Sequence, residues 1–189
     1  MPLSPPADRE PLHRRLIECR GYRRRDGLWD VEGHLVDTKT YSFPNHDRGE
    51  IHAGEALHEM WVRLTFDDDL VVRDVEAVTE AGPYKICPDA APRLAVLKGL
   101  RIAHGWTKAV KERLGGAKGC THLVEMLGPV ATVAYQTLVS LRMKRLDAMP
   151  TDRKPPVIDS CYAYRSDGEV VRRRWPQFFT GNPGGQPGA

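Results

Sequence analysis

The alternation of apolar and polar residues after Ala56 constrains the fold more than any other feature of this sequence. Met60, Val62, Leu64 and Phe66 share one parity, which is the two-residue period of a half-buried β-strand. Three aspartates at 67–69 then predict a turn, so residues 56–84 are expected to form a hairpin. His58 has the same parity as the apolar residues, and we expect its ring to point at the core or at a pocket beside it.

A similar pattern precedes this one and predicts another hairpin over residues 14–43. Asp26-Gly27 is the turn signal. On the second strand Trp29, Val31 and Leu35 share one face, and acidic residues with His34 share the other. Residues 44–55 are expected to form a polar loop. The two hairpins together predict an antiparallel sheet of about four strands.

The pattern becomes helical after Tyr84. Pro88 and Pro92 suit the first turns of a helix that runs to about residue 98, and a second helix is expected over 105–114. A long helix is predicted from Thr121 onward, with a kink at Pro129. Its apolar stripe consists of Leu123, Leu127, Val130, Ala134, Leu138 and Leu141. The fold class is therefore α+β, with the helices packed on one face of the sheet.

The chain divides into four predicted segments. Residues 1–10 form a flexible N-terminus and residues 11–147 form a single α+β domain. Residues 148–180 form a linker and a hairpin-like extension, with its turn at Asp167-Gly168. Residues 181–189 are rich in glycine and proline and are expected to be disordered.

Charge and composition restrict the partners. With 28 basic and 25 acidic residues the formal net charge is +3, so nucleic acid is not the expected partner. No apolar run is long enough for a membrane span, and the N-terminus lacks the apolar core of a signal peptide. We therefore expect a cytoplasmic protein that does not engage a membrane and binds a small molecule. A homo-oligomer is left open.

Cysteine and histidine gather at the start of the predicted long helix, in the order Cys120, Thr121, His122 after Gly119. A helix N-terminus offers free N–H groups and a partial positive charge, which lower the pKa of a thiol and can hold an anion. Thr121 could cap the helix. Three readings stay open at this point: a metal site, a reactive thiol with its base, or ordinary packing.

Two family resemblances arise from the same stretches. Residues 12–142 resemble a bacterial family named domain of unknown function 2889, on the strength of "RRDGLWDVEGHLVDTK", "LHEMWVRLTFDDDLVVRDVEA" and "GCTHLVEMLGPVATVAYQT". More loosely, Met60 to Leu141 resembles the NifU/IscU-type scaffolds of iron–sulfur cluster assembly. Those scaffolds run strand, acidic turn, strand, cysteine, helix, helix and then a Cys/His pair. This resemblance implies a NifU/IscU-like order of elements.

The scaffold resemblance places Cys87 where a cluster ligand would lie. It also places Cys120 and His122 at the Cys/His pair, so these three residues form a predicted metal site. A fourth ligand could come from His46, His52 or His58. Under this reading the cofactor is a zinc- or iron-type metal, and under the other reading there is none.

The resulting functional hypothesis is a small enzyme that acts on a small organic molecule, aromatic compounds included, without a nucleotide cofactor. Lyase- or isomerase-type acid/base chemistry needs a base and an oxygen stabiliser. His58 or His122 would be the base, and Tyr84 or the helix start would hold the oxyanion. The alternative is a metal-binding or iron–sulfur carrier of the NifU/IscU type.

Binding of the substrate or of its anionic group is assigned to three residues. Cys120 and Thr121 lie at the helix start, and Arg25 lies in the basic stretch "RGYRRRDG". The substrate pocket is expected between the sheet and the start of the long helix. Its aromatic walls would come from Trp29, Trp61, Tyr84 and Trp106.

Overall fold

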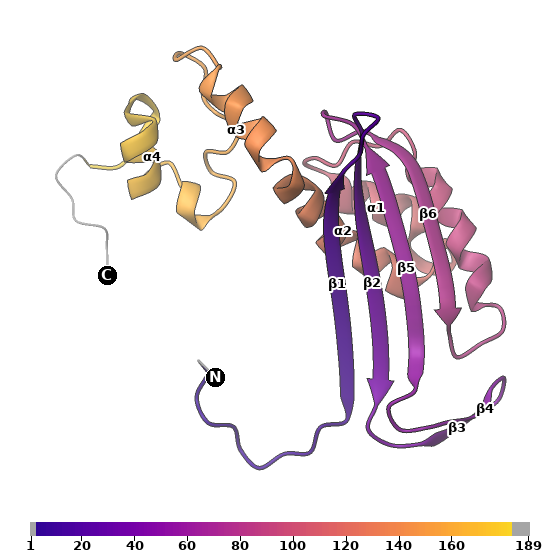
Figure 1. Cartoon of the computed structure of the whole chain (residues 1–189). Helices are drawn as coiled ribbons and strands as arrows, with labels where there is room; N and C mark the ends of the chain where they lie inside the picture. The colour runs from indigo at the N-terminus through magenta and orange to yellow at the C-terminus, as the bar shows by residue number, and fades with distance from the viewer. Residues whose placement is uncertain (1–2, 183–189) are drawn as a thin grey trace. The chain divides into compact units, whose positions relative to one another are not determined.

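The computed structural model describes residues 3–182. A four-stranded antiparallel sheet has the order β1-β2-β5-β6, as Figure 1 shows. The strands are β1 (His13–Arg23), β2 (Trp29–Lys39), β5 (Ala56–Phe66) and β6 (Val72–Ala81). The predicted polar loop contains a further small ladder of β3 (Phe43–Asn45) and β4 (Gly49–Ile51).

Helical segments follow the sheet in sequence. They are η1 (Cys87–Leu97), α1 (Trp106–Leu114), η2 (Gly116–Lys118), α2 (Thr121–Thr137) and α3 (Val139–Asp147). The helices α1 and α2 lie behind the sheet in Figure 1. The predicted α+β fold with a four-stranded antiparallel sheet is thus confirmed. None of the helices within residues 3–182 is long and apolar enough to cross a bilayer.

The alternation predicted from the sequence decides which face of the sheet is buried. Val31 and Leu35 on β2, and Met60, Val62 and Leu64 on β5, are all 0–1% exposed. They meet the apolar stripe of α2, where Leu123, Met126 and Val130 are fully buried. Burial of apolar surface on this one face is the main stabilising contribution to the unit.

Two glycines let α2 approach the sheet closely. A Cβ added to Gly33 of β2 would lie 2.7 Å from a methyl carbon of Val130, and one added to Gly21 of β1 would lie 1.8 Å from Thr137 Oγ1. Both glycines lie on the face that the helix covers. Any larger side chain at these positions would push α2 away from the sheet.

Some predicted elements differ in kind from those observed. The segment η1 is a 3₁₀ helix, with Pro92 inside it. The helix α2 continues through Pro129, and the break comes at Leu138, between α2 and α3. The turn between β5 and β6 is confirmed, with the Asp67 carboxylate accepting bonds from the N–H groups of Asp69 and Val71.

The described chain forms two compact units, one up to Val139 and another from Ser140. In the second unit the predicted C-terminal hairpin is wrong. The structure has η3 (Tyr162–Tyr164), α4 (Glu169–Arg174) and η4 (Pro176–Phe178). Gly168 is the N-cap residue of α4. Glu169 lies in the first turn of this helix and three arginines lie in the last turn, where the helix dipole stabilises their charges. The tail predicted to be disordered lies, from residue 183 on, outside the described residues.

Candidate functional site

An ion pair between a buried carboxylate and a partly exposed arginine lies under the start of α2. The registers of the sheet place Asp37 of β2 opposite Arg15 of β1 and opposite His58 of β5. Arg15 Nε and Nη2 donate to Asp37 Oδ1 and Oδ2, both at 2.7 Å. Burial acts to raise the pKa of the Asp37 carboxyl, but the hydrogen bonds and the charge of Arg15, followed by His58, outweigh it and lower the pKa. Asp37 is therefore ionised, although its side chain is only 1% exposed.

The Asp37 carboxylate orients His58. Nδ1 of His58 donates to Asp37 Oδ2 at 3.0 Å, which directs Nε2 the other way. Burial, and then the neighbouring His122, lower the pKa of His58 in spite of the carboxylate. Within residues 3–182 no hydrogen-bond partner is found for Nε2. His58 is thus a neutral imidazole with one nitrogen fixed and the other available as a base.

The ring of His122 completes a chain of contacts. Its centroid lies 3.7 Å from that of His58, with 31° between the planes. Its Nδ1 lies 3.7 Å from the Sγ atom of Cys120, which in turn lies 3.9 Å from the sulfur of Met60. Burial acts to raise the pKa of Cys120, but the contact with His122 and the N–H groups at the start of α2 lower it. The cluster of Arg15, Asp37, His58, His122 and Cys120 is hereafter called the histidine cluster.

The histidine cluster also offers ligands for a metal. One ligand atom from each of Asp37, His58 and His122 lies within 4.8 Å of the other two. Two imidazoles and a carboxylate suit zinc or iron. Within the part of the chain that the structure describes, neither Cys87 nor Cys120 belongs to such a group. Arg15 already bonds both oxygens of Asp37, so a cation there would have to compete with a guanidinium.

The structure brings three of the predicted site residues together. His58, His122 and Cys120 come from β5, α2 and the residue before α2, and their contacts are those given above. Thr121 adjoins them but is exposed, and it does not cap the helix. The N-cap residue is Cys120, which makes no side-chain capping bond.

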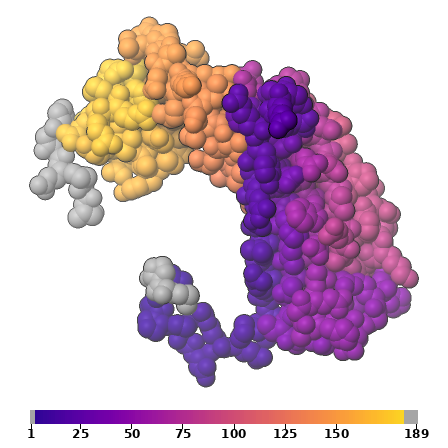
Figure 2. Space-filling model, in the orientation of Figure 1, coloured from indigo at the N-terminus to yellow at the C-terminus, as the bar shows by residue number. Residues whose placement is uncertain are grey.

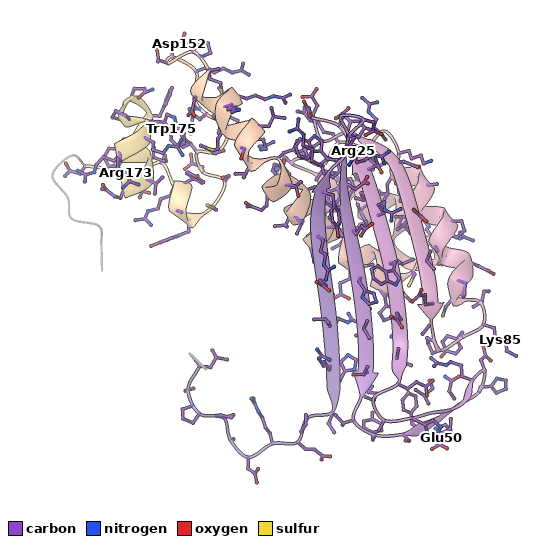
Figure 3. The ribbon with its side chains drawn as sticks, in the orientation of Figure 1. Arg25, Glu50, Lys85, Asp152, Arg173 and Trp175 are labelled. Carbon is purple, nitrogen blue, oxygen red and sulfur yellow. The ribbon has the colours of Figure 1, made fainter. Side chains whose placement is uncertain are left out.

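The other predicted site residues lie apart from the histidine cluster. Arg25 lies at the β1–β2 turn, at the opposite end of the sheet from Glu50 and Lys85 (Figure 3). Tyr84 is 60% exposed, and no bond joins it to the cluster within the described residues. Cys87 begins η1 and packs against Gly82. Their predicted roles stay predictions, without support from proximity.

Arg15 and Asp37 were not predicted as site residues. Asp37 shares the parity of Val31 and Leu35, so the sequence pattern alone places a carboxylate on the apolar face of β2. A carboxylate on that face indicates a paired or functional residue. Arg15 likewise has the parity of Ile17, a half-buried residue of β1. Their pairing could not be read from the sequence, because it depends on the register between two strands.

A pocket of about 660 Å³ lies between α1 and α2. Its lining is mostly apolar and includes Trp106, Val110, Leu114, Val124 and Leu127. The histidines are not part of this lining, but Glu125 is, and it accepts a hydrogen bond from Arg15. The pocket thus borders the histidine cluster instead of containing it.

The aromatic residues expected to wall one pocket are dispersed. Trp106 lines the pocket between α1 and α2 and donates to the carbonyl of Leu127 at 3.2 Å. Trp29 donates to Asp68, at the far end of the sheet. Trp61 stacks on His34 on the sheet face away from the helices, with ring centroids 3.7 Å apart.

Comparison with known proteins identifies the family of the chain but gives no activity or ligand. No curated protein and no solved structure matches the chain, so the likeness to NifU/IscU scaffolds stays a prediction. A family model described as "Protein of unknown function (DUF2889)" matches residues 13–136. This match runs from the first residue of β1 nearly to the end of α2 and includes the whole histidine cluster. The chain therefore belongs to the DUF2889 family.

Proposed function

We propose that this protein is a small enzyme that carries out acid/base chemistry, of lyase or isomerase type, on a small organic molecule without a nucleotide cofactor. The observation that carries the proposal is the buried relay from Arg15 through Asp37 to His58. An imidazole held by a carboxylate on one nitrogen, with a lowered pKa and a free second nitrogen, is the arrangement of a general base.

The chemical step follows from these roles. Nε2 of His58 takes a proton from the carbon next to a carbonyl, and the electron pair of that C–H bond moves onto the carbonyl oxygen as an enolate. N–H groups at the start of α2, beside Cys120, stabilise this negative charge. Where a C=C bond adjoins that carbon, the enolate is a dienolate, and return of the proton from His58 to its far carbon shifts the double bond and completes an isomerisation. Loss of a leaving group from the enolate completes an elimination instead.

Apolar parts of the substrate are assigned to the pocket between α1 and α2, which suits an aromatic ring. Glu125 lies at the border between the pocket and the histidine cluster. Val124→Trp would fill the pocket without touching the relay. We expect this variant to raise KM while the pH dependence of turnover stays that of the wild type.

A panel of lignin-type aromatic compounds, screened for binding and turnover, tests the proposal. His58→Gln should lower turnover by about 10²–10⁴-fold while the fold is retained. His34→Gln is the matched control, because His34 is a partly exposed histidine on β2 that bonds Glu59 at 3.0 Å. No binding and no turnover across the panel, or equal losses in both variants, would contradict the proposal.

A second candidate is metal binding at Asp37, His58 and His122, and it is favoured by the closeness of their ligand atoms. Metal content and the visible spectrum after anaerobic purification separate the two candidates. Stoichiometric metal that disappears in His122→Ala would support metal binding. Cys87→Ser tests the carrier alternative of the NifU/IscU type, because only that reading needs Cys87 as a ligand.

A further inference from the structure

The strand β1 forms one edge of the sheet. Its eleven residues pair with β2 from His13–Lys39 to Arg23–Trp29 without a register shift, and no strand of the described residues pairs with its other side. The opposite edge, β6, is partly covered, since Val72 exchanges hydrogen bonds of 2.8 Å with the 99–100 segment. A long, regular, unpaired edge is a template for another strand. In Figure 2 this indigo strand borders the sheet.

The backbone groups available at this edge can be identified. Thr40 N–H donates to the carbonyl of Leu12, and Arg24 N–H donates to that of Leu28. These bonds extend the β1–β2 ladder at its two ends, so the even-numbered residues of β1 bond β2. Because the pattern alternates along an antiparallel strand, the odd-numbered residues direct their N–H and C=O groups toward the free edge.

The side chains on the outer face of β1 are self-complementary. Leu16, Glu18, Arg20 and Tyr22 follow one another on this face in the order apolar, acidic, basic, apolar, and all four are exposed. A second β1, antiparallel and related by a two-fold axis at Cys19, places Glu18 opposite Arg20 and Leu16 opposite Tyr22. Each of these pairs then occurs twice. Glu18 and Arg20 already pair with each other at 2.7 Å within one chain, so the two chains together form a network of four alternating charges.

Neighbouring registers lack this complementarity. A shift by two residues in one direction places Glu18 opposite its own copy, and a shift in the other direction does the same for Arg20. In the register centred on Cys19 the charged pairs occupy the non-hydrogen-bonded positions, where side chains lie closest. Arg15 also meets Arg23 there, and Arg14 meets Arg24. Arg15 is already paired with Asp37 and Glu125, and Arg24 with Asp26 and Asp30.

We propose that the protein forms a two-fold dimer through β1, which joins two four-stranded sheets into one continuous sheet. The partner is a second copy of this chain, chosen by the match of Glu18 to Arg20 and of Leu16 to Tyr22. This inference is independent of the proposed enzymatic activity.

Sedimentation of the full-length chain tests the dimer. Wild type should have the mass of a dimer at micromolar concentration. Glu18→Arg and Arg20→Glu should each raise the dissociation constant by about tenfold or more, because each creates two like-charged pairs. The double variant E18R/R20E restores opposite charges and should return the dimer. Arg63→Glu, on the same sheet face but on β5, is the control and should leave the mass unchanged.

Three results of the sedimentation experiment would overturn the proposal. These are a monomeric wild type, single variants that dimerise as well as wild type, and a double variant that stays monomeric. The register has its own test in a Cys161→Ser background, which removes the exposed cysteine. Opposed residues at the centre lie about 5.5 Å apart between α-carbons, within the disulfide range. Mild oxidation should link the dimer through Cys19, and a dimer that does not link there would contradict the register.

Discussion

Arg15→Met should destabilise the protein because it leaves the buried Asp37 carboxylate without its guanidinium partner. The guanidinium supplies two of the hydrogen bonds to Asp37, whose side chain is 1% exposed, whereas Arg15 itself is 29% exposed. Breaking a buried ion pair by removing one partner costs about 3–5 kcal/mol. Because Arg15 is partly exposed, we take the lower end, about 3 kcal/mol, which corresponds to roughly a 10 °C fall in Tm.

Urea unfolding followed by circular dichroism measures this loss, and pH adds a second test. The lowered pKa of Asp37 stabilises wild type above pH 3.8, the value for the unfolded chain. Without Arg15, burial of Asp37 is opposed only by His58 and by His13, whose Nε2 lies 3.4 Å from Asp37 Oδ1. We therefore expect the pKa of Asp37 to rise and the variant to lose stability as pH rises. The gap between the two proteins should therefore widen from pH 4 toward pH 8.

Two variants decide whether the buried charge is the cause. Arg15→Met with Asp37→Asn leaves no charge buried and should recover most of the loss. Arg63→Met removes an arginine that is 44% exposed and bonded to Glu32 and Glu76, and it should cost less than about 1 kcal/mol. An Arg15→Met cost no larger than that of Arg63→Met, or no recovery in the double variant, would refute the reasoning.

Three further predictions concern single sites. The pKa of His58 is lowered in the folded protein, so the unfolded chain takes up the proton at a higher pH than the folded one. The free energy of unfolding should therefore fall as pH drops below 6.5. His58→Gln should weaken this pH dependence in urea melts recorded over a pH series. Gly21→Ala should cost about 1–3 kcal/mol in thermal melts, because its Cβ would meet Thr137, and Thr137→Ala should recover part of it. The alkylation rate of Cys120 should rise with a midpoint below pH 9, and His122→Ala should raise that midpoint.

Much of the first unit was readable because strand periodicity reports burial directly. The parity of Met60 and Val62 placed His58 on the buried face, and the apolar stripe placed His122 and Cys120 at the start of α2. The sequence could not supply the partner of His58, because the Asp37 carboxylate reaches it through strand pairing across 21 positions of the chain. Local pattern and long-range register are separate pieces of information.

The predictions that differ from the structure rest on local sequence signals that are typical of more than one structure. Asp167-Gly168 predicts a hairpin turn, whereas Gly168 is the N-cap residue of α4. Loop closure there also depends on Asp159, whose carboxylate accepts from the N–H of Ser166 and whose N–H donates to Tyr164. The ligand set of Cys87, Cys120 and His122 stays a prediction, whereas within residues 3–182 one ligand atom each from Asp37, His58 and His122 lies within 4.8 Å of the other two.

The tautomer and pKa of His58, measured by ¹⁵N NMR of the histidine rings over a pH series, test the central claim most directly. The account predicts an Nδ1–H tautomer at pH 7, an unprotonated Nε2, and a pKa below 6.5. Asp37→Asn should abolish the preference for that tautomer. A protonated Nε2 at pH 7, or a pKa at or above 6.5, would contradict the assignment of His58 as a base held ready by Asp37.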